Sequence, residues 1–128
     1  MSSGSKTALI TGSGQNIGRG IANQLALAGF NIIVNGSRSQ DAAEAVAAEV
    51  RAHGVEALVA MGNVGIKAEA EALAKAGLDH FGKIDVLVNN AAIRPHGPFL
   101  DMNDDEWQKV MDVDLNAAIW LSRVILPG

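Results

Sequence analysis

Hydrophobic and polar positions follow two alternating periods along this chain. Four short, nearly continuous apolar runs are bounded by Gly, Asn or Asp, at Lys6–Thr11, Asn31–Asn35, Glu56–Met61 and Ile84–Asn89. Apolar runs of this length are typical of strands buried on both faces of a parallel sheet. The pattern therefore predicts four such strands.

Helical patterns lie between these runs. The alanine-rich segment Asp41–His53 is predicted to form a helix that is closed by Gly54. Strands that alternate with helices predict right-handed βαβ crossovers and a doubly wound α/β sheet. Two further helices are predicted from apolar residues that recur at spacings of three and four, namely Ile17, Ile21, Leu25 and Ala28, and Ile66, Ala70, Leu73, Gly77 and Phe81.

The last predicted helix has a clear start signal. Asn103 is a good N-cap, and Met102 and Trp107 are spaced to form a hydrophobic staple around it. The helical pattern continues to Leu126, with room for a break, and a proline follows. The C-terminal half is apolar on all sides, which predicts that more than one side of this helix is covered.

Composition narrows the class of protein. The 128 residues are the length of one domain, and 48% hydrophobic and 19% charged residues indicate a soluble globular chain. A net charge of -4 argues against nucleic acid as a partner, and no apolar run is long enough to span a membrane. The absence of cysteine excludes disulfides and is compatible with a cytoplasmic location. We expect residues 1–5 to form a flexible N-terminus.

The loop after the first predicted strand carries the clearest chemical signal. In "TGSGQNIG" (residues 11–18), Gly12, Gly14 and Gly18 follow a spacing one residue longer than G-x-G-x-x-G. A glycine-rich turn between a strand and a helix directs backbone N–H groups and the helix dipole at a phosphate. A purely structural strand-to-helix turn is the alternative for this loop taken alone.

The longer spacing resembles the T-G-x-x-x-G-[IVA]-G loop of the short-chain dehydrogenase/reductase family. Thr11, Gly12, Ile17 and Gly18 are in place, and Asn16 replaces the middle glycine. Asn tolerates left-handed backbone angles better than other non-glycine residues, so we expect the conformation of the loop to be kept. The Asn16 amide could also approach the phosphates.

Three further stretches resemble the same family. Residues Asn89–Ala92 resemble its N-N-A-G motif, and Gly62–Val64 replaces an Asp-Val pair, with Asn63 keeping the acceptor but not the charge. The segment 105–128 resembles the helix that carries a Val-Asn-Leu motif and ends in Leu-Pro. The resemblance implies a Rossmann-like doubly wound parallel sheet, with four of the family's seven strands present, and a single NAD(P)-binding domain over residues 1–128.

The resemblance also implies a set of dinucleotide-binding residues. An acidic residue after the second strand would bind the ribose 2′-OH, but Gly36 stands at that position. Ser37 and Arg38 could instead hold a 2′-phosphate, which favours NADP over NAD, whereas Arg38 as a plain exposed loop residue is the alternative. The candidate residues are Gly12, Gly14, Gln15, Asn16, Ile17, Gly18, Ser37, Arg38, Asn63, Val64, Asn90, Ala91 and Ala92.

The family's catalytic tetrad of Asn, Ser, Tyr and Lys is largely absent, since the sequence has no tyrosine. Asp114 stands at the Asn position, where a role of its backbone carbonyl would survive the change, and a tolerated polar helix residue is the alternative. Arg94 and His96 follow the fourth strand, where an exposed loop is favoured over substrate contact. His53 and His80 are expected at helix ends on the surface, and no metal-ligand spacing is present.

These observations predict an NAD(P)-dependent oxidoreductase that transfers hydride between nicotinamide and a carbonyl or secondary alcohol. We expect the 128 residues to form its cofactor-binding half and not to turn over alone. A non-catalytic dinucleotide-binding module and an inactive fragment are the alternatives. The apolar run Ile84–Asn89 would leave an unprotected sheet edge, so we expect further chain, or a homo-oligomer (dimer or tetramer), to cover the exposed apolar surfaces.

Overall fold

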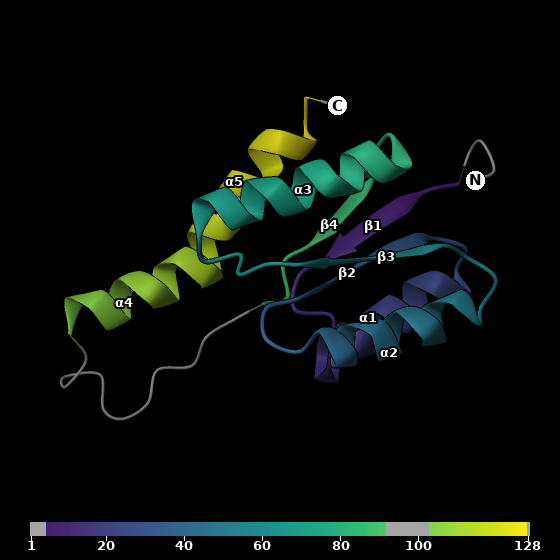
Figure 1. Ribbon diagram of the computed structural model, residues 1–128. Coiled ribbons are helices and arrows are strands. Elements are labelled where there is room, and N and C mark those ends of the chain that lie inside the picture. The colour runs from purple at the N-terminus through teal and green to yellow at the C-terminus, as the bar shows by residue number, and fades with distance from the viewer. Residues whose placement is uncertain (1–4, 92–102, 128) are drawn as a thin grey trace.

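The computed structural model describes residues 5–91 and 103–127, which form strands and helices in alternation (Figure 1). The residues predicted as a flexible N-terminus lie outside the described part except for Ser5. The elements are β1 (Thr7–Ile10), α1 (Asn16–Leu27), β2 (Asn31–Gly36), α2 (Gln40–Arg51), β3 (Ala57–Met61), α3 (Lys67–Phe81), β4 (Val86–Val88), α4 (Asp104–Met111), the π-helical turn η2 (Asp112–Asn116) and α5 (Ala117–Ile125).

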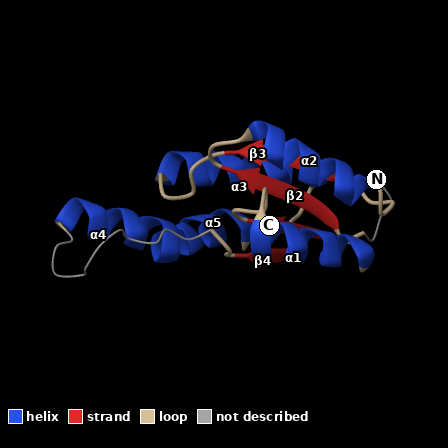
Figure 2. Cartoon of the chain, turned by 90° about the horizontal axis from the view of Figure 1, so that it is seen from below, coloured by secondary structure: helices blue, strands red, loops and turns tan. Residues whose placement is uncertain are grey.

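The four strands form one parallel sheet in the order β3-β2-β1-β4. Leu9 in the middle of β1 pairs with Ile33 of β2 on one side and with Leu87 of β4 on the other. Helices cover both faces of this sheet (Figure 2). The prediction of a doubly wound α/β sheet is therefore confirmed.

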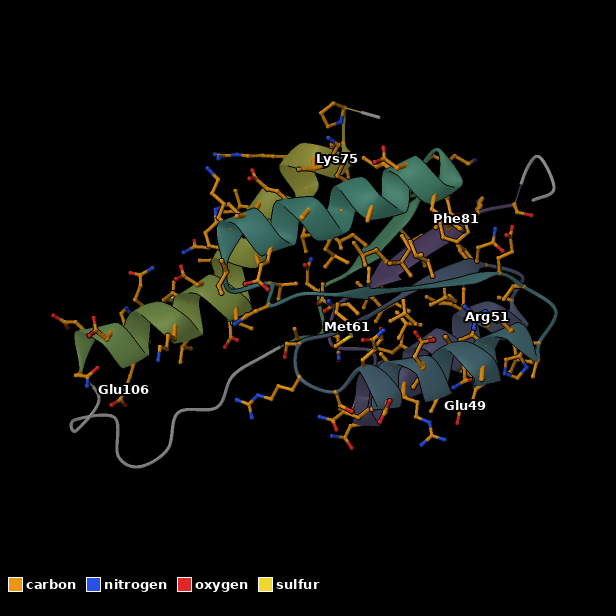
Figure 3. All side chains as sticks on the ribbon, in the orientation of Figure 1. Glu49, Arg51, Met61, Lys75, Phe81 and Glu106 are labelled. Atoms are coloured by element: carbon orange, nitrogen blue, oxygen red, sulfur yellow. The ribbon has the colours of Figure 1, made fainter. Side chains whose placement is uncertain are left out.

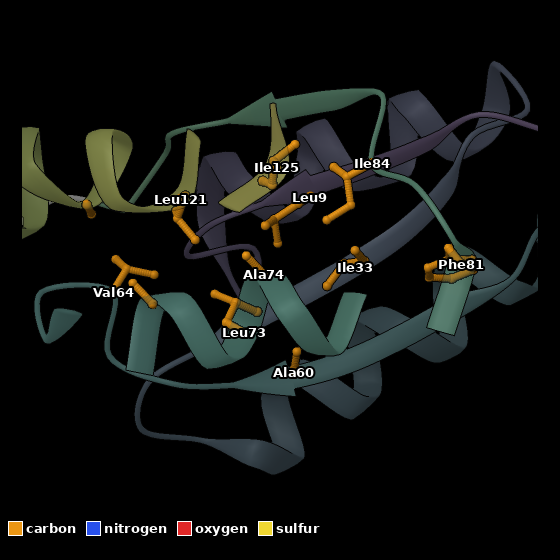
Figure 4. Packing of buried hydrophobic residues seen from close by; sticks show 12 residues of the cluster. Leu9, Ile33, Ala60, Val64, Leu73, Ala74, Phe81, Ile84, Leu121 and Ile125 are labelled. Carbon is orange, nitrogen blue, oxygen red and sulfur yellow. The ribbon is translucent and has the colours of Figure 1, made fainter. Parts of the chain in front are cut away.

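Alternate strand residues supply two separate cores. On one face, Leu9 and Ile33 pack with α3 and α5, where Leu73 and Leu121 are buried (Figure 4). On the other face, the neighbouring strand residues pack against α1 and α2. Because both faces of each inner strand are buried, β1 and β2 read as continuous apolar runs in the sequence.

The predicted helix α1 is present, and its most deeply buried residues are small. The buried residues of this helix are Gly18, Ala22 and Ala26, whereas the side chain of Ile17 is 75% exposed. Ile21 and Leu25 are partly buried against the same core, and together with Ile17 they line an open groove of about 530 Å³ beside the edge strand β4. Small residues face the core because they let the helix lie close to the sheet. The groove is lined by Ile17, Gly20, Ile21, Gln24, Leu25, Val86 and Val88.

Strand β4 is shorter than the predicted run Ile84–Asn89. At its start, a carboxylate oxygen of Asp85 accepts a hydrogen bond from the backbone N–H of Thr7 at 2.8 Å. At its end, Asn90 N–H donates to the carbonyl of Val88 at 3.1 Å, which turns the chain out of the strand. The Asp85 N–H also donates to the carbonyl of Thr7 at 2.8 Å, so β1 and β4 stay joined just before the three residues of the strand.

The last helix is broken, as the pattern allowed. The Asn103 side chain accepts a hydrogen bond from the Glu106 N–H at 2.8 Å, so Asn103 is the predicted N-cap, whereas Met102 of the staple lies outside the described residues. The helix α4 extends away from the sheet, and none of its residues is buried (Figure 1). Only after the π-helical turn does α5 bury residues against α3, among them Leu121 and Ile125.

Across residues 5–91 and 103–127, every helix is too short or too polar to cross a lipid bilayer.

Candidate functional site

The loop between β1 and α1 has the backbone conformation predicted from its sequence. Gly12 has a φ of 63° and Asn16 a φ of 54°. Among the described residues, Asn16 is the only non-glycine residue with a positive φ. Asn16 therefore takes over the left-handed conformation that a glycine would adopt with less strain.

Gly18 is required by close packing. A Cβ atom at this position would lie 2.4 Å from the carbonyl oxygen of Gly12 and 2.5 Å from the side-chain nitrogen of Asn90. No side chain fits at these distances. The first turn of α1 thus packs directly on the loop that precedes it and on the end of β4.

The N-terminus of α1 is left open for an anion. Gln15 is the N-cap residue and has an extended backbone conformation. Within the described helix Asn16–Leu27, no side chain caps the N-terminus and no acidic residue lies in the first turn. The first N–H groups of a helix have no partner within it and carry partial positive charge. Gly14, Gln15, Asn16 and Ile17 surround this helix end, and the Gln15, Asn16 and Ile17 side chains are exposed.

Thr11 joins the loop to the end of β4. Its buried hydroxyl accepts hydrogen bonds from the N–H groups of Asn90 and Ala91, each at 3.0 Å. The Asn90 side chain donates to the carbonyl of Gly12 at 3.1 Å. These bonds place Asn90 and Ala91 beside the glycine loop, whereas Ala92 lies outside the described residues.

The chain leaves β2 at Gly36, and the exposed residues Ser37 and Arg38 follow. A Cβ atom at Gly36 would lie 3.4 Å from the terminal methyl group of Met61, which points toward α2 from the end of β3 (Figure 3). Arg38 is at the same edge of the sheet as the glycine loop, because parallel strands share their carboxyl edge. The role of Arg38 at a 2′-phosphate stays a prediction.

The turn after β3 carries Asn63 and Val64. The Asn63 side-chain oxygen accepts from the Gly65 N–H at 2.9 Å, and the Asn63 N–H donates to the Glu69 carboxylate at 3.0 Å. These bonds fix an exposed turn at the same edge of the sheet. Val64 is 4% exposed and packs in the core, so only its backbone is available to a ligand.

Asp114 lies in the π-helical turn, where its side chain is exposed. This turn packs against the turn after β3, since a Cβ atom at Gly65 would lie 2.6 Å from a methyl group of Val113. π-helical turns inside α-helices are frequent at functional sites. Asp114 therefore belongs to the same carboxyl edge as Asn63.

The remaining polar candidates are not brought to this edge. His53 is exposed, and its Nε2 lies 3.0 Å from the side-chain oxygen of Asn23. The ring of His80 packs edge-on against Phe81. Arg94 and His96 lie outside the described residues. Within residues 5–91 and 103–127, no group of three or more His, Asp or Glu side chains could hold a metal ion.

Sequence reasoning missed Ser13 and Asn35, which are both buried beside the glycine loop. The Asn35 side chain accepts a hydrogen bond from the Gly12 N–H at 3.0 Å, and the Ser13 hydroxyl donates to the carbonyl of Ile10 at 2.7 Å. For Asn35, the signal in the sequence is a polar residue at the end of the apolar run Asn31–Asn35. Such a residue usually marks only the boundary of a strand.

Known proteins match almost the whole length of this chain. A family model described as short chain dehydrogenase matches residues 6–128. A 3-oxoacyl-[acyl-carrier-protein] reductase from Staphylococcus epidermidis is 40% identical over 122 residues, which are 95% of this chain and 50% of that relative.

Solved structures with the same fold include two that contain a nicotinamide dinucleotide. A blue fluorescent protein from a metagenomic library, in complex with NADPH, superposes with a TM-score of 0.91 at 26% identity, over 96% of this chain and 51% of that one. A metagenomic short-chain oxidoreductase in complex with NADP superposes with a TM-score of 0.88 at 32% identity, over 95% and 55%. The chain thus spans about half the length of the relatives that it matches.

Proposed function

Because the chain belongs to the short-chain dehydrogenase family, we propose that it provides the dinucleotide site of an NAD(P)-dependent oxidoreductase. The observation that carries the proposal is the β1–α1 loop, in which Gly12 and Asn16 adopt positive φ before an uncapped helix N-terminus. This arrangement directs backbone N–H groups at a diphosphate. Residues 1–128 then act as a single nucleotide-binding domain.

Each part of the cofactor is proposed to lie along the carboxyl edge of the sheet. Gly12, Gly14, Gln15, Asn16, Ile17 and Gly18 would surround the diphosphate, and Asn63 with the Val64 backbone would lie at the adenine. Asn90, Ala91 and Ala92 would lie toward the nicotinamide. A bound nicotinamide supplies or accepts the hydride that is exchanged with a carbonyl or secondary alcohol.

NADP is the proposed form of the cofactor. Gly36 carries no carboxylate to repel a 2′-phosphate, and Ser37 and Arg38 follow it at an exposed position. Two structurally similar proteins, at 26% and 32% identity, contain NADPH and NADP. The alternative, an Arg38 that stays in solvent, predicts no preference between NADPH and NADH.

Titration of the chain with NADPH and NADH by intrinsic or nucleotide fluorescence tests this proposal. We expect NADPH to bind more tightly, and Gly36→Asp to weaken NADPH about tenfold or more, because a carboxylate would face the 2′-phosphate. A Cβ atom at Gly36 would be in ordinary van der Waals contact with Met61 and Ala43, at 3.4–3.6 Å. Arg38→Ala should weaken NADPH but not NADH. Binding of neither dinucleotide would overturn the proposed function.

The chain alone is not proposed to catalyse hydride transfer. The sequence has no tyrosine to exchange a proton with the substrate oxygen, and Asp114 replaces the Asn that the family resemblance implies. The backbone carbonyl of Asp114 in the π-helical turn could still serve the role inferred for that Asn. A 3-oxoacyl thioester is the first carbonyl substrate to assay, because a reductase of that class is 40% identical; no NADPH oxidation is expected from the 128 residues.

We also propose that the protein is a homo-oligomer of the cytoplasm and has neither nucleic acid nor a membrane as partner. The net charge of -4 opposes binding to a phosphate backbone. Exposed apolar side chains lie along α4, the π-helical turn and α5, where Trp107, Leu115 and Ile119 are 48%, 50% and 43% exposed. Large exposed apolar side chains of this kind support a contact between subunits.

A further inference from the structure

The buried side chain of Asn35 connects two loops that are far apart in the sequence. Asn35 is 2% exposed and is the last residue but one of β2. Its oxygen accepts from the Gly12 N–H at 3.0 Å, and its amide nitrogen donates to the carbonyls of Ala60 and Gly62 at 3.0 and 3.1 Å. Both hydrogens of the Asn35 amide therefore take part in hydrogen bonds, and the amide group cannot rotate without breaking them.

The backbone of Asn35 adds to this connection. Its N–H donates to the Ser13 hydroxyl and its carbonyl accepts from the Ser13 N–H, each at 2.9 Å. Two successive residues of the glycine loop, Gly12 and Ser13, are thus bound to one residue of β2. The loop has no freedom to shift along the strand while these bonds last.

The connection crosses β2 and joins the ends of its two neighbouring strands. Strands β1 and β3 are not neighbours, because β2 lies between them. Asn35 bonds the loop that follows β1 on one side and the end of β3 on the other, one residue before Asn63. Any ligand that contacts both the glycine loop and Asn63 therefore reaches across the residue that joins them.

We propose that Asn35 is a positioning residue that fixes the glycine loop relative to the turn after β3, and so sets the affinity for a ligand spanning both. The inference rests on the proposed function, in which the diphosphate lies at the loop and the adenosine at Asn63. When two subsites are held at the right distance, the second contact of a ligand forms at high effective concentration. Loosening the connection removes this gain and leaves each subsite able to bind a small fragment.

The chain contains a matched control for this effect. Asn31 lies at the other end of β2 and is 4% exposed. Its side chain accepts a hydrogen bond at 3.0 Å from the N–H of Glu56, the residue before β3. It is the same residue type on the same strand and bonds the same neighbouring segment. It is remote from the glycine loop, so it reports what the loss of a buried Asn does to stability alone.

The experiment compares the dissociation constants of NADPH, which spans both subsites, and adenosine 2′-phosphate, which contains no diphosphate. We expect Asn35→Ala to weaken NADPH about tenfold, the factor for one buried hydrogen bond, and to change adenosine 2′-phosphate less than about threefold. Asn31→Ala should leave both constants within about threefold of the original chain. Circular dichroism shows that each variant is folded at the temperature used.

A second variant keeps the test independent of any cavity. Asn35→Asp has the same size and retains an acceptor for the Gly12 N–H, but it places an oxygen against the carbonyls of Ala60 and Gly62. It should show the same split between the two ligands. Equal losses for both ligands, an unchanged NADPH affinity in the Asn35 variants, or an equal loss in Asn31→Ala would overturn the inference. If the unsubstituted chain binds neither ligand, the proposed function fails, and the inference fails with it.

Discussion

Asn16 shows how a single backbone angle determines which residues a loop accepts. Its φ of 54° is unfavourable for any residue with a Cβ atom, although less so for Asn. We expect Asn16→Gly to leave the free energy of unfolding unchanged or to raise it by up to about 1 kcal/mol. Asn16→Val should lower it by about 1–2 kcal/mol. Thermal and urea unfolding measure both effects.

The same pair of variants separates conformation from ligand contact. If the Asn16 amide contacts a phosphate, Asn16→Gly binds NADPH less tightly although it is at least as stable. If Asn16 serves only the backbone conformation, NADPH affinity stays the same. A clear loss of stability in Asn16→Gly would contradict the strain assigned to this position.

Glu49 predicts a pH dependence of stability. The Arg19 guanidinium donates two hydrogen bonds to its carboxylate, and Asn23 donates a third, so the pKa of Glu49 is lowered from its usual value of 4.5. A pKa lowered by folding stabilises the fold above the unfolded value, and this stabilisation is lost as the pH falls through the folded value. The contacts join α1 to α2 on the surface.

We therefore expect Glu49→Gln to be less stable than the original chain at pH 7, with the difference vanishing as the pH falls well below 4.5. Urea unfolding at several pH values measures this difference. The difference should also shrink at high salt, because the pair lies at the surface, with the Arg19 side chain 55% and the Glu49 side chain 34% exposed. Glu44→Gln, on the same helix, is the control for the loss of one carboxylate from α2. A difference that grows as the pH falls would contradict the assignment.

At the scale of elements, the cap of α4 is expected to have a local effect. None of the residues of α4 is buried, so packing contributes little and the Asn103 cap contributes a large share of its stability. We expect Asn103→Ala to destabilise this helix by about 1 kcal/mol, whereas Asn103→Asp should retain the stability of the helix because Asp is also a good N-cap. Hydrogen exchange of the α4 amides should increase while exchange in β1 and β2 does not. Equal increases throughout the chain would contradict a local effect.

The sequence predicts elements better than it predicts which of their faces is buried. Strands β1 and β2 were found where continuous apolar runs predicted them, because both of their faces are buried. The periodic pattern of Ile17, Ile21 and Leu25 predicted the helix α1 but does not indicate which of its residues are buried most deeply. Close packing selects Gly18 and two alanines, and the spacing of the sheet and helix that requires this is not visible in local sequence.

Local sequence is also limited in how much of the candidate site it can predict. The glycine loop and the Asn90 motif are contiguous stretches, so a pattern of neighbouring residues was sufficient to propose them. The role of Asn35 depends on bonds to residues 23, 25 and 27 positions away, which only the register of the strands brings together. The conformation of Asn16 was predicted correctly because the steric preference that determines it is local.

At the scale of the whole molecule, exposed apolar surface predicts association. Leu115 and Ile119 lie one helical turn apart on the π-helical turn and α5, and both are about half exposed. In water, burying such side chains against a second copy of the chain contributes about 25 cal/mol per Å² of apolar area. The groove between α1 and β4 is a second apolar surface on the opposite face of the sheet from α5, so the two surfaces can be tested separately.

We expect the double substitution Leu115→Glu and Ile119→Glu to lower the molar mass measured by light scattering during size-exclusion chromatography, because charges would face each other across the contact. The core residue Leu121 is not touched, so circular dichroism should remain unchanged. Lys75→Glu on α3, a charged residue on the exposed side of a neighbouring helix (Figure 3), is the control and should leave the mass unchanged. If the double variant retains the mass of the original chain while Ile21→Glu in the groove lowers it, association occurs through α1 and β4. An original chain that is monomeric at all concentrations would refute the proposed homo-oligomer.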